Sequence, residues 1–252
     1  MSAPASDPSS DRERVVLVTG GGQRVGRALA LALGERGWRV AVHYHASDAG
    51  ARETVRLIDA GDAERAQPFQ ADLRDAGACA ELIRRVADTF GRLDALVNSA
   101  GVMLRTPVGD VSATQWDDMF AINLRAPFFL TQAAAPLLAE RRGSVVNIAD
   151  LAAFETWPAY VPHGISKAGV VQMTRALART LAPGVRVNAI APGAVLLPES
   201  WEPSAASRMA QTTPLGRIGS PSDVAQAMLY LLDAGYVTGE TILVDGGRHV
   251  RC

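Results

Sequence analysis

The chain has 252 residues, of which 48% are hydrophobic, so it is long enough to bury a sizeable core. Its 25 basic and 26 acidic residues leave a formal net charge of −1, and no basic run exceeds a pair. This balance argues against a charge-driven interface with nucleic acid or with an anionic membrane. Two cysteines make no disulfide framework, so we expect a reducing, cytoplasmic setting.

The N-terminal segment, residues 1–14, is polar and rich in Pro and Ser. It lacks the apolar stretch of a signal peptide, and we predict a disordered tail there. No apolar run in the chain reaches the ~18 residues that a membrane span needs. We see no linker and no internal repeat after the tail, which predicts one domain over residues 15–252.

Short β-branched runs alternate with helical patterns along the rest of the chain. Strands are predicted at 14–20, 38–44, 66–72, 93–101, 143–150, 185–193 and 240–247. Helices are predicted at about 24–36, 47–60, 75–90, 113–140 with breaks at Pro127 and Pro136, 162–181 and 221–233, and residues up to about 219 after the sixth strand are predicted as loop. The strands are continuous apolar runs, as expected where helices cover both faces of a sheet. The pattern therefore predicts an α/β fold, a doubly wound parallel sheet of about seven strands.

The first strand runs into TGGGQRVG (19–26), which opens a helix. Its glycines, Gly20 and Gly26 among them, allow a tight turn and a close backbone approach, and Val25 begins the helix behind them. A pyrophosphate would then sit on the helix N-terminus. The alternative is that the turn is purely structural.

The second strand ends in VHYHAS (42–47), with no Asp or Glu to hold the 2′-hydroxyl of an NAD ribose. His45, Ser47 and Arg24 stand there or nearby instead, and they suit a 2′-phosphate. We therefore predict NADPH as the cofactor. The alternative is that Arg24 and His45 are solvated surface residues.

Several motifs in this order make the chain resemble the short-chain dehydrogenase/reductase family over nearly its whole length after residue 14. They are TGGGQRVG (19–26), Asp72, NSAG (98–101), Asn123, Lys167, APG (191–193) and VDGG (244–247). The resemblance implies a Rossmann-type fold and hydride transfer from NADPH to a C=N or C=O group of a small molecule. It also implies a set of cofactor contacts: adenine at Asp72 and Leu73, ribose at Asn98, Ala100 and Gly101, and the nicotinamide carboxamide at Pro192, Gly193 and Val195. Lys167 is a further expected cofactor contact. No metal site is assigned.

More narrowly, HYHAS (43–47), Asp150 and the closing VTGETILVDGGRHVR (237–251) are similar to the pteridine reductase branch, including bacterial dihydromonapterin and dihydrofolate reductases. A reduced pterin is therefore the first expected substrate, and another small carbonyl compound is the alternative. That branch usually has an aromatic residue where this chain has Met103. Trp157 or Trp201 could supply the aromatic wall, although either could equally be a packing residue.

The family's catalytic set is Asn, Ser, Tyr and Lys, and here Asn123 and Lys167 match it. Asp150 stands in the place of the Ser, and His163 stands in the place of the proton-donating Tyr. Pro162 suits the first turn of a helix that places His163 and Lys167 on one face, at i and i+4. Lys167 and the helix N-terminus disfavour an imidazolium, whereas Asp150 favours it.

Three interpretations of His163 remain open. An Asp150–His163 pair could donate the proton, or Tyr160 could swing in as the donor. The third interpretation is a catalytically silent NADPH-binding protein that acts as a sensor or partner subunit.

The resemblance also implies a homotetramer, built partly on the helices at 113–140 and 162–181. The second of these carries more apolar positions than one core-facing stripe requires: Val170, Val171, Met173, Leu177 and Leu181. The alternative is that all five side chains face their own sheet.

Overall fold

The computed structural model describes residues 14–60, 64–197 and 202–250. The predicted tail at 1–13 lies outside these residues. Arg14 belongs to the folded domain, because its carbonyl oxygen accepts a hydrogen bond from Arg39 N at 2.8 Å and its guanidinium lies over the Trp38 ring. Arg14, which the sequence assigns to the tail, thus contacts the folded part of the chain.

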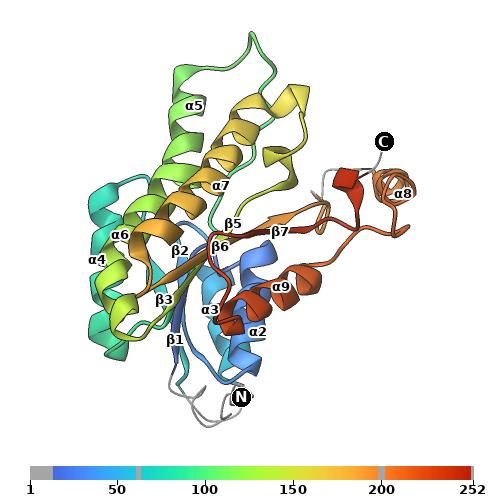
Figure 1. The fold of residues 1–252 in the computed structure, drawn as a ribbon. Helices are drawn as coiled ribbons and strands as arrows, with labels where there is room; N and C mark the ends of the chain where they lie inside the picture. The colour runs from blue at the N-terminus through green and yellow to red at the C-terminus, as the bar shows by residue number, and fades with distance from the viewer. Residues whose placement is uncertain (1–13, 61–63, 198–201, 251–252) are drawn as a thin grey trace.

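A parallel sheet of seven strands forms the centre of the molecule, in the order β3-β2-β1-β4-β5-β6-β7 (Figure 1). The strands are β1 Val15–Val18, β2 Arg39–Tyr44, β3 Ala66–Gln70, β4 Ala95–Asn98, β5 Ser144–Ile148, β6 Arg186–Pro192 and β7 Thr241–Val244. Every neighbouring pair is parallel. The predicted fold class, Rossmann-type and doubly wound, is confirmed.

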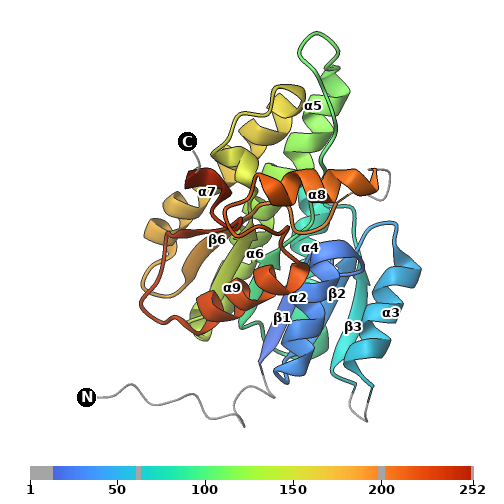
Figure 2. The same cartoon turned by 90° about the vertical axis from the view of Figure 1, so that its right-hand side faces the viewer.

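Helices cover both faces of this sheet, as Figures 1 and 2 show from two directions. The α-helices are α2 Arg24–Glu35, α3 Asp48–Ile58, α4 Ala76–Phe90, α5 Ala113–Phe120, α6 Ala126–Glu140, α7 Val161–Leu181, α8 Pro203–Gln211 and α9 Pro221–Asp233. On one face, α2 contacts both α3 and α9; on the other, α6 contacts both α4 and α7.

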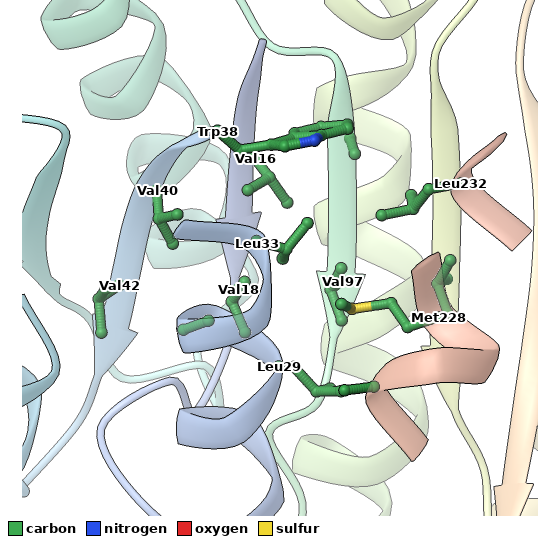
Figure 3. Packing of buried hydrophobic residues seen from close by; sticks show 14 of the residues in the cluster. Val16, Val18, Leu29, Leu33, Trp38, Val40, Val42, Val97, Met228 and Leu232 are labelled. Carbon is green, nitrogen blue, oxygen red and sulfur yellow. The ribbon is translucent and has the colours of Figure 1, made fainter. Parts of the chain in front are cut away.

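Each face has its own hydrophobic core. Figure 3 shows one of them, in which Leu29 and Leu33 of α2 and Met228 of α9 pack on strand valines such as Val18 and Val97. The other core is built from buried residues of α4, α6 and α7 against the opposite side of the same strands. Burial on both sides explains why the strands are apolar without alternation.

The predicted breaks at Pro127 and Pro136 are wrong. Pro127 stands in the first turn of α6 and Pro136 lies inside that helix. The irregularity falls earlier, at a π-helical segment, Ala121–Arg125, which holds Asn123. Burial of the α6 face that carries Leu130 and Leu138 outweighs the helix-breaking tendency of Pro136.

A helix was also missed, because α8 lies inside the stretch predicted as loop. Its sequence, PSAASRMAQ, does carry a signal: a proline at the first position, followed by good helix formers. Two short 3₁₀-helices, Leu151–Ala153 and Pro158–Tyr160, precede α7, and a third, Arg248–Val250, follows β7.

The strand order reverses direction between β1 and β4, since the chain runs outward from β1 to β3 and then returns to β4. In such sheets ligands bind in the crevice beyond the carboxyl ends of the strands, at this switch point. None of the helices within the described ranges combines the length and apolar character of a membrane span.

Candidate functional site

A cavity of about 860 Å³ lies where the topology places it, lined by residues that follow β1 to β6. The described wall contains most of the residues predicted from sequence. They are Gly20, Arg24, Val25, Gly26, His45, Ser47, Asp72, Leu73, Ala100, Gly101, Met103, Asp150, Trp157, His163, Lys167, Pro192, Gly193 and Val195. Asn98, Asn123 and Tyr160 are not part of the described wall, and Trp201 lies outside the described residues.

The glycine turn, residues 19–26, has the shape that a close phosphate approach requires. Gly20 adopts φ +66°, and a Cβ on Gly26 would lie 2.2 Å from the Gly20 carbonyl oxygen. Only glycine fits at either position. The turn leads directly into the N-terminus of α2, so the wall offers a backbone cradle for a pyrophosphate.

His43 is a residue of this region that the sequence reasoning missed. Its Nδ1 accepts a hydrogen bond from Gly20 N at 3.1 Å, and its Nε2 donates to the Ala71 carbonyl oxygen at 3.2 Å. Burial lowers the pKa of His43 to about 4, against the opposing effect of the bond to Ala71. A neutral imidazole therefore ties the glycine turn to β2 and to the end of β3.

A second missed residue, Arg74, lines the part of the cavity that the sequence predicts to hold adenosine, which we call the adenosine end and define as His45, Ser47, Asp72, Leu73 and Arg74. The Arg74 guanidinium pairs with Asp72 at 2.8 Å and lowers the pKa of that carboxyl. Its Nη2 also lies 3.3 Å from His45 Nε2. Ser47 begins α3 without using its hydroxyl as a cap.

Arg24 takes a different direction from the one predicted for a 2′-phosphate partner. It has a left-handed backbone, φ +50°, and its Nη2 donates to the Leu196 carbonyl oxygen at 3.0 Å. Leu196 belongs to the segment after β6 and also lines the cavity. The Arg24 side chain thus connects the glycine turn to the segment after β6.

Asn98 is not brought into the cavity. Its Nδ2 donates to Asn147 Oδ1 at 2.8 Å and to Thr131 Oγ1 at 3.4 Å, inside the core. As the last residue of β4 it points to the packed face, and only the residues after it reach the wall. A cofactor contact by the Asn98 side chain has no support in this geometry.

Asp150 and His163, which the sequence suggests as a proton-donating pair, both line the cavity, and we call them the donor pair. Asp150 Oδ2 lies 3.6 Å from His163 Nε2, with side chains 25% and 4% exposed. The other Asp150 oxygen accepts a hydrogen bond from Ala152 N, because Asp150 caps the short helix that follows β5. His163 Nε2 is buried and has no hydrogen-bond partner among the described residues, since Asp150 Oδ2 lies just beyond hydrogen-bonding distance.

Lys167 lies one turn along α7 and is buried with His163, as the i, i+4 spacing predicts. Its Nζ donates to the Ile148 carbonyl oxygen at 2.8 Å. Burial lowers the pKa of Lys167, and the Asp150 carboxylate opposes this shift. A Cβ on Gly101 would lie 3.5 Å from Lys167 Nζ and 3.2 Å from Asn123 Oδ1, so both side chains meet behind Gly101.

The remaining wall is partly aromatic. Trp157 donates from Nε1 to Glu155 at 3.0 Å, and Arg248, which sequence reasoning missed, stacks over its ring and pairs with Glu155 at 3.2 Å. Met103 lies on this wall and is 42% exposed. The Tyr160 ring packs edge-to-face on Trp157. Of the two proposed proton donors, the cavity brings His163 to its wall and not Tyr160.

Comparisons with known proteins agree with this architecture. Residues 22–249 match the family model described as enoyl-(acyl carrier protein) reductase. A crystal structure described as that of a short-chain alcohol dehydrogenase from Sinorhizobium meliloti 1021 superimposes with a TM-score of 0.89 at 38% identity, covering 95% of this chain and 97% of the other.

Curated relatives match over nearly the full chain as well. Ketoacyl reductase 2 of the granaticin polyketide synthase from Streptomyces violaceoruber is 36% identical over 94% of this chain and 96% of its own length. A 3-oxoacyl-[acyl-carrier-protein] reductase from Staphylococcus aureus is 34% identical over 93% and 97%. The 3beta-hydroxysteroid dehydrogenase 1 of Eggerthella lenta is 36% identical over 93% of both chains.

Proposed function

The chain belongs to the short-chain dehydrogenase/reductase family of oxidoreductases, and from that membership we propose that it is an NADPH-dependent reductase of a small carbonyl compound. The observation that carries the proposal is the donor pair. A carboxylate and an imidazole with an unpartnered nitrogen lie beside a buried lysine, at the end of a cavity shaped for a dinucleotide.

The residues present fit a nicotinamide dinucleotide phosphate. The glycine turn would hold the pyrophosphate, and the adenosine end offers His45, Ser47 and Arg74 to a 2′-phosphate. Lys167 and the segment after β6 would hold the nicotinamide half. When bound there, the cofactor supplies a hydride to the substrate carbon.

The proton would come from the donor pair. As the substrate oxygen gains negative charge, a proton carried by His163 Nε2, which lies 3.6 Å from Asp150 Oδ2, would pass to it. The bond between this proton and the donor pair breaks, its two electrons stay on the donor pair, and an O–H bond forms on the substrate. Lys167, the neighbouring ammonium, favours the negative charge that develops on that oxygen.

A ketone is the preferred substrate class, because the three curated relatives above carry names of ketone reductases or a hydroxysteroid dehydrogenase. None of the three names a pterin. A dihydropteridine or dihydrofolate remains the second candidate on one observation, which is that Trp157 lines the same cavity as Met103. A flat heterocycle could stack there.

The alternative to an enzyme is a protein that binds NADPH without catalysis and acts as a sensor or partner subunit. The presence of His163 where the family has its proton-donating Tyr favours this alternative. The decay of NADPH fluorescence in the presence of 3-oxoacyl thioesters, hydroxysteroid-type ketones and dihydropteridines separates these proposals. Turnover of a ketone supports the reductase, and turnover of a pterin alone supports the second candidate. NADPH binding without turnover of any compound would contradict both.

A further inference from the structure

We propose that Asn123 is a positioning residue that sets which nitrogen of His163 carries hydrogen. It acts through the peptide group of Val102 and leaves Nε2, the nitrogen nearest Asp150, as the one that gains and loses the proton. Only the effect on turnover rests on the proposed function. The assignment of the hydrogen rests on geometry.

Both polar atoms of the Asn123 side-chain amide make hydrogen bonds, and these bonds establish which atom is the oxygen and which is the nitrogen. Its Oδ1 accepts from Val102 N at 2.8 Å, and its Nδ2 donates to the Val102 carbonyl oxygen at 2.9 Å. Since a backbone N–H can only donate, the amide cannot be reversed. The second Nδ2 hydrogen goes to Ser166 Oγ at 3.1 Å, and Ser166 donates to the carbonyl oxygen of His163 at 2.7 Å.

The Val102 carbonyl oxygen, held in this way, also faces His163 Nδ1 at 3.2 Å. A carbonyl oxygen can only accept, so the contact is a hydrogen bond only if Nδ1 carries the hydrogen. A neutral imidazole has a single N–H, which leaves a lone pair on Nε2. Nε2 has no hydrogen-bond partner among the described residues, and the nearby Asp150 Oδ2, at 3.6 Å, is beyond hydrogen-bonding distance, so no hydrogen bond at Nε2 opposes this assignment.

The consequence concerns the path of the proton. With Nδ1–H directed at Val102, a proton that enters the donor pair can bind only Nε2 or Asp150. When it leaves for the substrate, its bonding electrons stay on the pair and His163 returns to the Nδ1–H form. The two Asn123 hydrogen bonds hold the Val102 peptide group in place. Without them, the hydrogen of the neutral ring could move from Nδ1 to Nε2, and Nε2 would lose the lone pair that accepts a proton beside Asp150.

The test is the ¹⁵N spectrum of protein labelled at its four histidines, with the His163 signals identified by their loss in His163→Phe. A nitrogen with a lone pair and one with hydrogen have well-separated shifts, so the neutral form reports its tautomer directly. We expect Nδ1–H in the parent. In Asn123→Ala and in the isosteric Asn123→Asp, we expect Nε2–H to gain population.

Asn188→Ala is the matched control. Asn188 is buried and clamps another backbone segment in the same manner, donating to Val237 O at 2.9 Å and accepting from Glu240 N at 3.1 Å, away from the cavity wall. It should lower stability without changing the His163 tautomer. Turnover should fall about 10–100-fold in Asn123→Ala, as for other residues that orient a working histidine.

Nε2–H in the parent would overturn the inference, and so would a tautomer that stays unchanged in both Asn123 variants. If the parent holds Nδ1–H and the Asn123 variants shift it, the positioning role stands even where no substrate is turned over. In that case it is the reductase function that fails.

Discussion

His163 Nε2 and Asp150 Oδ2 lie 3.6 Å apart, one on α7 and the other at the end of β5, and both belong to the wall of the same cavity. The sequence offers only a spacing of residue types. The fold turns it into a carboxylate–imidazole pair, with the imidazole almost wholly buried and the carboxylate partly open to the cavity.

The first prediction concerns Asp150→Asn. The Asp150 carboxylate places a negative charge 3.6 Å from His163 Nε2, and the amide that replaces it carries none. Turnover at a fixed pH should therefore fall about 10–100-fold, the usual cost of losing a group that orients a working histidine. The measurement is the rate of ketone reduction, with His249→Gln as a histidine change outside the cavity wall. An unchanged rate in Asp150→Asn would show that the carboxylate does not act on the donor.

The second prediction concerns cofactor choice. NADPH should bind more tightly than NADH, because His45, Ser47 and Arg74 offer hydrogen-bond donors to a 2′-phosphate. Arg74→Ala should therefore weaken the binding of NADPH more than that of NADH. Because the Arg24 side chain donates to the Leu196 carbonyl oxygen, Arg24→Ala should change the preference for NADPH over NADH less than Arg74→Ala does. Calorimetric titration of both cofactors checks this, and equal affinities in the parent would remove the basis for the 2′-phosphate site.

The third prediction follows from His43. Its pKa is lowered from 6.5 to about 4 in the folded state, so between these values the unfolded chain binds more protons. The free energy of unfolding should therefore fall as pH falls through this window, by roughly 3 kcal/mol in total. Urea unfolding at a series of pH values measures the slope.

His43 and His45, two positions apart in the sequence, allow this slope to be assigned to one histidine. His43→Gln should flatten the slope between about pH 6.5 and 4, whereas His45→Gln, at an exposed position, should retain it. A slope that survives in His43→Gln would place the proton uptake elsewhere.

The fourth prediction is the homotetramer. The α7 residues that the sequence suggests for it pack within their own chain. Val170 and Val171 are buried in a small cluster against which Met173 packs, and Leu177 and Leu181 pack on the core formed with α4 and α6. Exposed apolar side chains on neighbouring helices are the better basis, Trp116 on α5, Phe128 on α6 and Ile165 on α7. Sedimentation should give a tetramer for the parent and smaller species for Phe128→Arg. A monomeric parent would refute assembly through these helices.

Much of the fold could be predicted because its signals are local. Strands buried on both faces read as apolar runs, and all seven were found with ends within three residues of those observed. The breaks expected at Pro127 and Pro136 failed because packing of α6 decides that region. The helix α8 was missed although Pro203 marked its start.

The site residues also fall into two groups, those that a local pattern predicts and those that only the packing of the fold brings into place. Motif residues such as Gly20, Asp150 and Lys167 reach the cavity because each follows a strand end or lies on a helix face that the pattern defines. Asn98 does not, since the face of its strand to which it points depends on packing with Asn147. Arg248 stacks on Trp157 from 91 positions away, a contact that only the sheet order creates.

The donor pair itself is best tested by single-turnover oxidation of NADPH with a reducible ketone, comparing the parent with His163→Phe and Tyr160→Phe. We expect His163→Phe to lose about 10²–10⁴-fold in rate, the usual effect of removing an acid–base group, while NADPH affinity is retained. Tyr160→Phe, an aromatic change three positions away, should leave the rate nearly unchanged. A His163→Phe protein as fast as the parent would contradict the assignment of His163 as proton donor.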